Sequence, residues 1–252
     1  MTKFVVLLTF WAALLAGVPV TAQVINTEQK RTIQDSDGWI GSVDVGFGLT
    51  KNTRTILQTN SRINAQYHKK RHTLLLLNDL NLLKVDSNSI QNSGFQHVRY
   101  AYQLRKYLIP EAFVQAQYNQ VWKLDFRFLA GAGPRFQLLK NDSNRVFMGV
   151  LGMYEFEKVD GGLRYNRDFR VSAYLSMGFG LNKKLTFESI TYFQPLIRMP
   201  RDFRLSSESS LRAAITKHLG FKTSFQLNFD SRPPDGLTRM FYSFQNGLTF
   251  KF

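Results

Sequence analysis

The sequence predicts an all-β fold, namely a single closed antiparallel transmembrane β-barrel of about twelve strands. Apolar and polar residues alternate through most of the chain, as in strands with one face toward lipid and one toward a polar interior. Residues 237–252 alternate in the same way and end the chain on an aromatic residue. Beyond the amino-terminal region no apolar run is long enough to cross a bilayer as a helix, which excludes a helical membrane protein.

The amino terminus has the pattern of an export signal. A charged start at Lys3 is followed by an apolar run over residues 4–20 and by the small residues Thr21 and Ala22. This pattern predicts a cleaved signal peptide over residues 1–22, with Gln23 as the first mature residue. A retained anchor is disfavoured, because the run is at the short limit of the ~17–25 residues that span a bilayer.

Residues 23–37 show no periodicity. We expect them to form a periplasmic amino-terminal segment before a barrel over residues 38–252. Two alternatives remain open for this segment, a flexible arm and a partial plug of the barrel.

The strands are located by their period-2 alternation, which is clearest over residues 219–230. Most are longer than the ~5–6 residues usual in soluble sheets and suit the ~9–11 residues that a tilted strand needs to cross a membrane. We predict strands at 38–50, 54–67, 72–83, 94–105, 111–120, 123–139, 145–157, 163–179, 184–195, 201–215, 218–230 and 237–252.

The connections have a predicted asymmetry. With a periplasmic amino terminus, the odd-numbered connections lie outside the cell, and these include the longest ones expected, near 84–93, 158–168 and 231–238. Short periplasmic turns with longer external loops are typical of bacterial barrels. The apolar run Thr73 to Leu77 disturbs the alternation and indicates packing against something inside the lumen.

The chain is strongly basic, with 33 Lys and Arg against 18 Asp and Glu. An exported protein meets little nucleic acid, so we expect no nucleic-acid partner and assign the counter-charges to outer-membrane lipid and lipopolysaccharide phosphates. Arginines near the predicted external rim are candidates for these contacts: Arg198, Arg201, Arg232 and Arg239. A monomer is slightly favoured over an oligomer.

Two segments carry a family resemblance. Residues 125–136 (Asp125 to Phe136) contain an Arg-x-x-x-Gly-x-Gly-x-Arg motif, and residues 149–157 end in Tyr154-Glu155-Phe156-Glu157. Through them the chain resembles the YdiY-like family of salt-induced outer-membrane proteins, a domain family of unknown function, over Trp39 to Phe252. The resemblance implies a barrel in the outer membrane of a Gram-negative bacterium and implies no catalytic residue and no ligand.

The carboxy-terminal strand resembles the closing strand of outer-membrane barrels, whose terminal Phe is read by the insertion machinery. We therefore expect Leu248, Phe250 and Phe252 to form the insertion signal and that machinery to be a partner during biogenesis.

The register of the alternation turns many charged side chains into the lumen, where planar guanidinium groups suit carboxylate pairing. The predicted lumen charge network consists of Arg62, Arg99, Asp125, Arg127, Arg135, Glu155, Glu157, Arg170, Glu188, Arg204, Glu208 and Arg212. Such a network indicates a plugged or narrow barrel with a structural, envelope role. The alternative is a small passive pore with mild anion preference.

A lipid or lipopolysaccharide hydrolase is the third alternative, and it would need a Ser beside a His near the external rim. The four histidines do not fit that placement, and His97 among polar lumen residues indicates a hydrogen-bonded filler. The chain has no cysteine, and His68 and His72 lie in a predicted turn rich in Lys and Arg. We therefore expect no catalytic residue, no metal and no cofactor.

Overall fold

A computed structural model describes residues 24–31, 36–234 and 236–250 of the chain. The predicted signal peptide over residues 1–22 lies outside this part. The described residues form twelve β-strands and one 3₁₀ turn, η1 (Asp160–Gly162). The strands are β1 (Gly38–Lys51), β2 (Thr55–Lys69), β3 (His72–Val85), β4 (Asn88–Tyr102), β5 (Leu108–Asn119), β6 (Leu124–Lys140), β7 (Asn144–Val159), β8 (Arg164–Asn182), β9 (Leu185–Leu196), β10 (Met199–Ala214), β11 (Leu219–Asp230) and β12 (Met240–Phe250).

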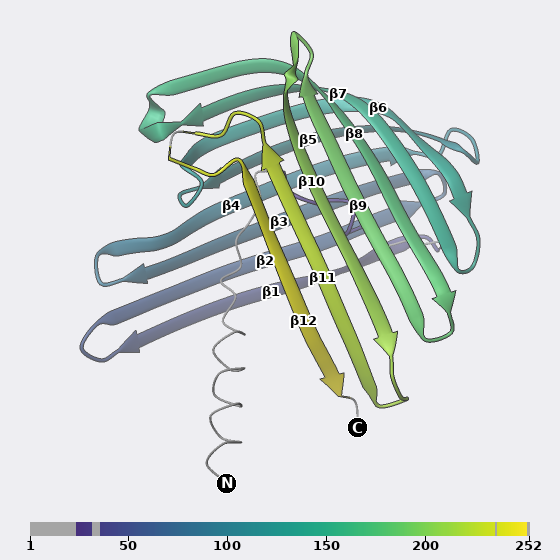
Figure 1. The fold of residues 1–252 in the computed structure, drawn as a ribbon, viewed down its shortest axis with the longest axis horizontal. Coiled ribbons are helices and arrows are strands. Elements are labelled where there is room, and N and C mark those ends of the chain that lie inside the picture. Colours follow the sequence, from purple (N-terminus) through teal and green to yellow (C-terminus); the bar gives the residue numbers. More distant parts are fainter. Residues whose placement is uncertain (1–23, 32–35, 235, 251–252) are drawn as a thin grey trace.

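All twelve strands belong to one sheet whose spatial order is the chain order, β1 to β12, with antiparallel pairing throughout (Figure 1). The strands run from 11 residues in β12 to 19 residues in β8. The predicted all-β class, strand number and antiparallel order are thus confirmed. Period-2 alternation located the strands because most of them alternate in polarity between their two faces, with β3 at residues 74–77 and the start of β6 as exceptions.

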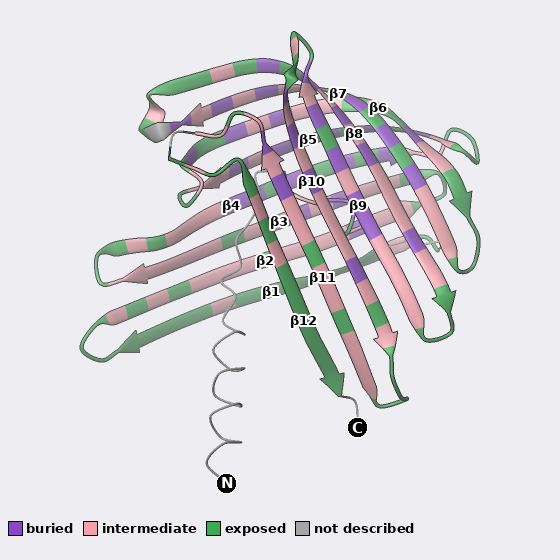
Figure 2. Cartoon of the chain, in the orientation of Figure 1, coloured by how far each residue is buried: buried purple, intermediate pink, exposed green. Residues whose placement is uncertain are grey.

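The sheet curves around an interior, but its two edges are not joined (Figure 1). Within the described residues β1 pairs only with β2, and β12 pairs only with β11. Both edge strands are exposed over nearly their whole length, whereas burial is concentrated on β4 to β10 (Figure 2). The described residues therefore form a curved, open twelve-stranded sheet, and the closure predicted from the sequence is not confirmed.

Apolar and charged groups share the interior. The larger apolar cluster contains Phe113, Leu129, Leu151 and Met153, with two tyrosines, Ile190 and Val24. Gly131, opposite this cluster, leaves room for it, since a Cβ there would lie 2.7 Å from the Phe113 ring. The interior is packed rather than open.

Residues 24–31 lie inside this curved sheet. Val24 belongs to the larger apolar cluster, and Ile25 packs against a second one formed by Leu75, Leu77 and Phe95. This contact explains the apolar run of the third strand, whose inward leucines face the amino-terminal segment. Residues 24–31 thus contact the inner face of the sheet at both apolar clusters.

The connections do not have the predicted asymmetry. Residues 84–93 were expected to form a long external loop, but β3 and β4 extend to a tight turn at residues 86–87. Asp86 adopts a φ of 55° there, and its carboxylate accepts a hydrogen bond from the Thr55 backbone N–H at 2.8 Å. Of the three long connections expected, only the one over residues 231–239 is clearly long.

Among the described residues, no helix has the length and apolar character needed to span a bilayer.

Candidate functional site

The interior contains two clusters of buried charge. We call the first the barrel cluster, because strands alone supply it: Arg127, Glu155, Glu157, Arg170, Asp202, Arg204 and Asp230. We call the second the segment cluster, because residues 24–31 supply part of it: Glu28, Arg31, Arg99, Glu111 and Arg135.

Glu155 on β7 is the centre of the barrel cluster and is completely buried. Its carboxylate accepts hydrogen bonds from Arg127 Nε at 2.6 Å and from Arg170 Nε at 2.7 Å, and Arg204 also donates to it. These arginines lie on β6, β8 and β10, so one carboxylate connects four strands. Alternation brings them together, because each occupies an inward position of its strand.

The remaining acids of the barrel cluster complete the pairing of the arginines. Arg204 also binds Glu157 at 3.0 Å and Asp230 at 3.0 Å, and Arg170 binds Asp202 at 3.0 Å. Three guanidiniums thus face four carboxylates, a difference of 3 − 4 = −1. Buried ions are tolerated only when they are paired and hydrogen-bonded in this way.

In the segment cluster, Glu28 of the amino-terminal segment lies between two strand arginines. Its Oε1 accepts from Arg99 Nη1 on β4 at 2.9 Å, and its Oε2 lies 3.0 Å from Arg135 Nη1 on β6. Arg31 of the same segment donates to Glu111 on β5 at 2.7 Å. The segment therefore supplies one acid and one base to the buried network.

Glu111 is the only carboxylate that the strands supply to this cluster among the described contacts. It lies 3.2 Å from Arg99, 3.4 Å from Arg135, and it accepts a hydrogen bond from the Tyr174 hydroxyl at 3.1 Å. Aromatic rings on the strands hold the guanidiniums, with Arg135 at 4.1 Å from the centre of the Phe147 ring. Two guanidiniums thus share one strand carboxylate.

Hydrogen bonds attach the segment to the sheet at further points. The Tyr192 hydroxyl accepts from the Glu28 backbone N–H at 3.2 Å and lies 3.3 Å from the Thr27 hydroxyl. Asn26 donates to Glu208 at 3.0 Å. The Lys30 ammonium lies 3.7 Å from Asp79 on β3.

Burial and neighbouring carboxylates shift the pKa values of two charged groups of the segment. Burial lowers the pKa of the Lys30 ammonium, and nearby Asp79 offsets only part of that effect. Burial also opposes the charge of Arg31, but Glu111 and Glu28 outweigh it and raise the pKa of this guanidinium. The Arg31 guanidinium is therefore positively charged in the interior.

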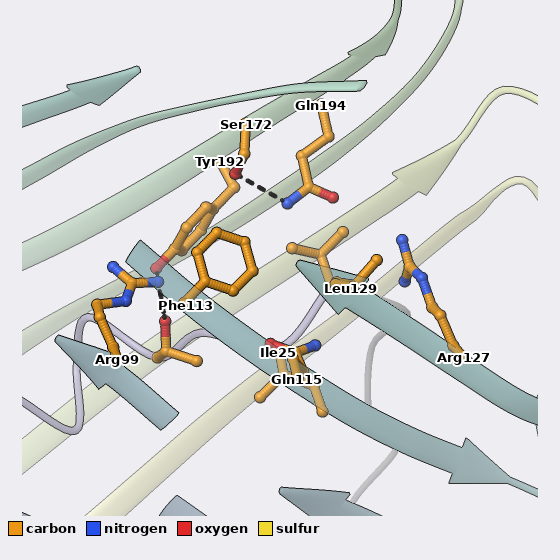
Figure 3. Close-up of a pocket in the computed structure, with 11 residues that line it drawn as sticks. Ile25, Arg99, Phe113, Gln115, Arg127, Leu129, Ser172, Tyr192 and Gln194 are labelled. Atoms are coloured by element: carbon orange, nitrogen blue, oxygen red, sulfur yellow. Dashed lines mark hydrogen bonds between the residues drawn. The ribbon is translucent and has the colours of Figure 1, made fainter. Parts of the chain in front are cut away.

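A small cavity lies beside the segment (Figure 3). Its volume is about 20 Å³, room for about one water molecule. Figure 3 shows Phe113, Gln115, Ser172 and Gln194 around it, with Gln194 donating to the Ser172 hydroxyl at 3.2 Å.

The structure brings seven of the predicted lumen residues into the two clusters. These are Arg99, Arg127, Arg135, Glu155, Glu157, Arg170 and Arg204. Four others form smaller contacts nearer the surface. Glu188 pairs with Arg145 and Arg212, Arg62 pairs with Asp79, and Glu208 accepts from Asn26.

The prediction for Asp125 is wrong. Asp125 lies on β6 but is exposed. It accepts a hydrogen bond from the Gly162 backbone N–H at 2.7 Å, so it contacts the turn between β7 and β8 and not the lumen. A register shift between Leu124 and Phe126 interrupts the alternation here and turns Leu124 inward instead.

Of the expected insertion signal, Leu248 and Phe250 lie on β12 and are exposed, while Phe252 lies outside the described residues.

Sequence reasoning missed Glu28 and Arg31, because the segment that carries them has no periodicity. It also missed the roles of Tyr174 and Tyr192, whose hydroxyls bind Glu111 and the segment. Composition gave no signal for them, because the inward arginines of β4 and β6 are matched by three acids on neighbouring strands, Glu111, Glu155 and Glu157.

The histidines show no catalytic arrangement in their recorded contacts. His97 lies between Phe95 and Phe113, bonds the Gln115 amide oxygen at 3.0 Å and accepts from Arg99 at 3.3 Å. His68 bonds Thr73, and His72 bonds the Tyr100 hydroxyl. Residues 24–31, 36–234 and 236–250 contain no group of three His, Cys, Asp or Glu side chains that could hold a metal ion.

This geometry defines a class: a twelve-stranded antiparallel β-sheet protein whose polar interior is filled by ion pairs and by its own amino-terminal segment. The model of the family "Protein of unknown function, DUF481" matches residues 43–252. The chain therefore belongs to the DUF481 family, and the resemblance to the YdiY-like proteins is confirmed.

A solved structure similar to the chain is titled "NanC porin structure in rhombohedral crystal form", with 11% identity, a TM-score of 0.48, and coverage of 84% of this chain and 100% of that one. A search of curated proteins finds no match.

Proposed function

We propose that this protein is a closed, plugged β-barrel in the outer membrane of a Gram-negative bacterium, with a structural role in the envelope. The observation that carries the proposal is the filled interior. Two buried ion clusters and residues 24–31 occupy the space in which a pore would run, and the cavity beside the segment holds about one water molecule.

A membrane location is supported by the outward face of the sheet. The edge strand β1 presents Trp39, Val43, Val45, Phe47 and Leu49 on one face, each more than half exposed. Monomeric soluble proteins rarely expose contiguous apolar surface of this kind. A hydrocarbon environment would cover these residues.

Closure is supported by the hydrogen-bonding requirement of that environment. The outer edges of β1 and β12 carry backbone groups that have no partner strand in the curved sheet. Each unsatisfied group costs several kcal/mol in lipid, so a membrane sheet must close on itself. We therefore propose that β1 and β12 pair in the membrane.

The proposed partners are those of an outer-membrane barrel. Lipopolysaccharide phosphates would meet the rim arginines Arg198, Arg201, Arg232 and Arg239, of which Arg198 pairs with Asp168 at 2.8 Å. Replacing the four by Gln should raise the detergent sensitivity of the envelope, and unchanged sensitivity would remove this part of the proposal. The insertion machinery would read the carboxy-terminal strand, and the barrel would act as a monomer without catalytic activity.

Single-channel recording tests the sealed interior. The chain is exported in cells, purified from outer membranes, and added to a planar bilayer in potassium chloride, with heat-modifiable gel mobility as the check of folding. A sealed barrel inserts without conductance steps. Stable steps from the unmodified chain would favour the small passive pore instead.

A further inference from the structure

We infer that Arg99 and Arg135 form a binding site for a small hydroxy acid, and that Glu28 of the chain's own amino-terminal segment occupies this site as a tethered competitor. The inference rests on the proposed function, because it takes the plugged barrel as the resting state. To the plugged resting state the inference adds a class of ligand and a role for residues 24–31, which would leave the site when the ligand binds.

The first argument is the geometry around the Glu28 carboxylate. Each of its oxygens meets a different strand arginine, Arg99 at 2.9 Å and Arg135 at 3.0 Å. Rings hold both guanidiniums independently of the segment, because Phe113 and Phe147 lie 5.3 Å and 4.1 Å from them. The strands therefore present a preorganised pair of carboxylate-binding groups.

The second argument is charge. With the segment in place, Arg31, Arg99 and Arg135 face Glu28 and Glu111, a difference of 3 − 2 = +1, and without it two strand guanidiniums face Glu111 alone, a difference of 2 − 1 = +1. Glu111 lies farther from Arg99 and Arg135, at 3.2 Å and 3.4 Å, than Glu28 does. Arg135 Nε also has no hydrogen-bond partner among the described atoms. The site therefore keeps an excess positive charge in either state, and Arg99 and Arg135 lose their nearest carboxylate when the segment leaves. An added anion would restore that pairing, since a poorly paired buried cation is unfavourable.

The third argument indicates a hydroxyl beside that carboxylate. Arg99 Nη2 donates to the Thr27 hydroxyl at 3.1 Å, and the Tyr192 hydroxyl lies 3.3 Å from it (Figure 3 shows the Arg99 contact). The adjoining cavity is lined by Gln115, and Gln194 Oε1 there has no hydrogen-bond partner among the described atoms. Thr27 and Glu28 together present a hydroxyl and a carboxylate, the two groups of a hydroxy acid.

The segment is attached in a way that permits exchange. Residues 24–31 belong to no strand, and their recorded backbone hydrogen bond, from Arg31 N–H to the Glu28 carbonyl at 3.1 Å, is internal. Each recorded contact with the sheet involves a side chain of the sheet, including those to the segment backbone at Glu28 N–H, Lys30 O and Val24 O, and none is part of a strand ladder. A tethered group has an effective concentration in the millimolar range, so a free ligand competes well only when the segment is removed or weakened.

The test compares the unmodified chain with a variant lacking residues 24–31, both purified from outer membranes and checked for heat-modifiable mobility. Single-channel current is recorded in a potassium chloride gradient, and then with glycolate, acetate or ethylene glycol added. We expect an anion-selective current from the deletion variant. Glycolate should block it at about tenfold lower concentration than acetate, because of its added hydrogen bonds, and ethylene glycol should not block it.

Two further comparisons locate the site. In the deletion variant, Arg99→Gln and Arg135→Gln should each abolish the block by glycolate. The matched control Arg145→Gln, which removes a half-exposed arginine paired with Glu188, should retain it.

A peptide of residues 24–31 should close the deletion variant, and the same peptide with Glu28→Gln should not.

The outcomes separate the two proposals. Conductance of the unmodified chain would refute the plugged barrel itself. Silence of the unmodified chain together with a folded deletion variant that is silent, cation-selective or equally blocked by glycolate and acetate would overturn only the ligand site. If the deletion variant does not fold, calorimetric binding of glycolate to full-length Glu28→Gln decides: binding above that of the unmodified chain supports the site, and equal binding overturns it.

Discussion

The barrel cluster and the segment cluster are built from the same residue types but differ in what completes them. Around Glu155, strands supply every charge, and three arginines meet four acids. Around Glu111, strands supply two arginines and one acid, and the segment supplies a second acid, Glu28, and a third arginine, Arg31. A self-contained network holds strands together, whereas a network completed by a segment outside the strands can also bind a substitute.

The largest expected effect is at the centre of the barrel cluster. Glu155→Gln removes the charge that three buried arginines share, and we expect a loss of ~3–5 kcal/mol in the free energy of unfolding. Urea unfolding in detergent, followed by gel mobility, measures it. A loss below ~1 kcal/mol would mean that this cluster does not hold the strands.

A steric change tests the packing next to the segment cluster. A Cβ at Gly149 would lie 2.2 Å from the Tyr174 ring, whose hydroxyl binds Glu111. We expect Gly149→Ala to cost ~1–3 kcal/mol through overpacking. Gly152→Ala on the same strand is the matched control, because a Cβ there meets nothing within 4 Å. Equal stability of the two variants in the same urea assay would show that Tyr174 is not fixed at this position.

The smallest effect is expected at the rim of the barrel. Glu188 pairs with Arg145 and Arg212, whose side chains are 42% and 53% exposed. Glu188→Gln should therefore cost only ~0–1 kcal/mol, and less in high salt. The stability of this variant and of Glu155→Gln is compared at low and at high salt. A salt-insensitive loss as large as that of Glu155→Gln would remove the distinction between buried and rim pairs.

The sequence predicted what depends on local periodicity. Inward residues such as Arg127 and Glu155 were identified because alternation continues along their strands. Asp125 was misplaced because a register shift at the start of β6 is a property of pairing with β7, which one strand's pattern does not contain. Turn lengths were misjudged at residues 84–93 because polar residues there continue the strands.

The position of Glu28 could not be predicted for a different reason. Nothing in the segment around it has a period, and its partners Arg99 and Arg135 are far away in the sequence. Long-range ion pairs depend on the curved arrangement of several strands at once. The inward arginines of β4 and β6 equal the neighbouring strand acids in number, so composition does not indicate a further acid either.

Cysteine labelling tests the central claim, that residues 24–31 occupy the interior, most directly, since the chain has no cysteine of its own. Thr27, which is 2% exposed, is replaced by Cys, and Lys106 in the exposed β4–β5 turn provides the Lys106→Cys control. The folded proteins are treated with a bulky polar maleimide. The account predicts rapid modification at position 106 and protection at position 27 until the protein is unfolded. Equal labelling rates in the folded protein would place the segment outside the barrel and contradict the account.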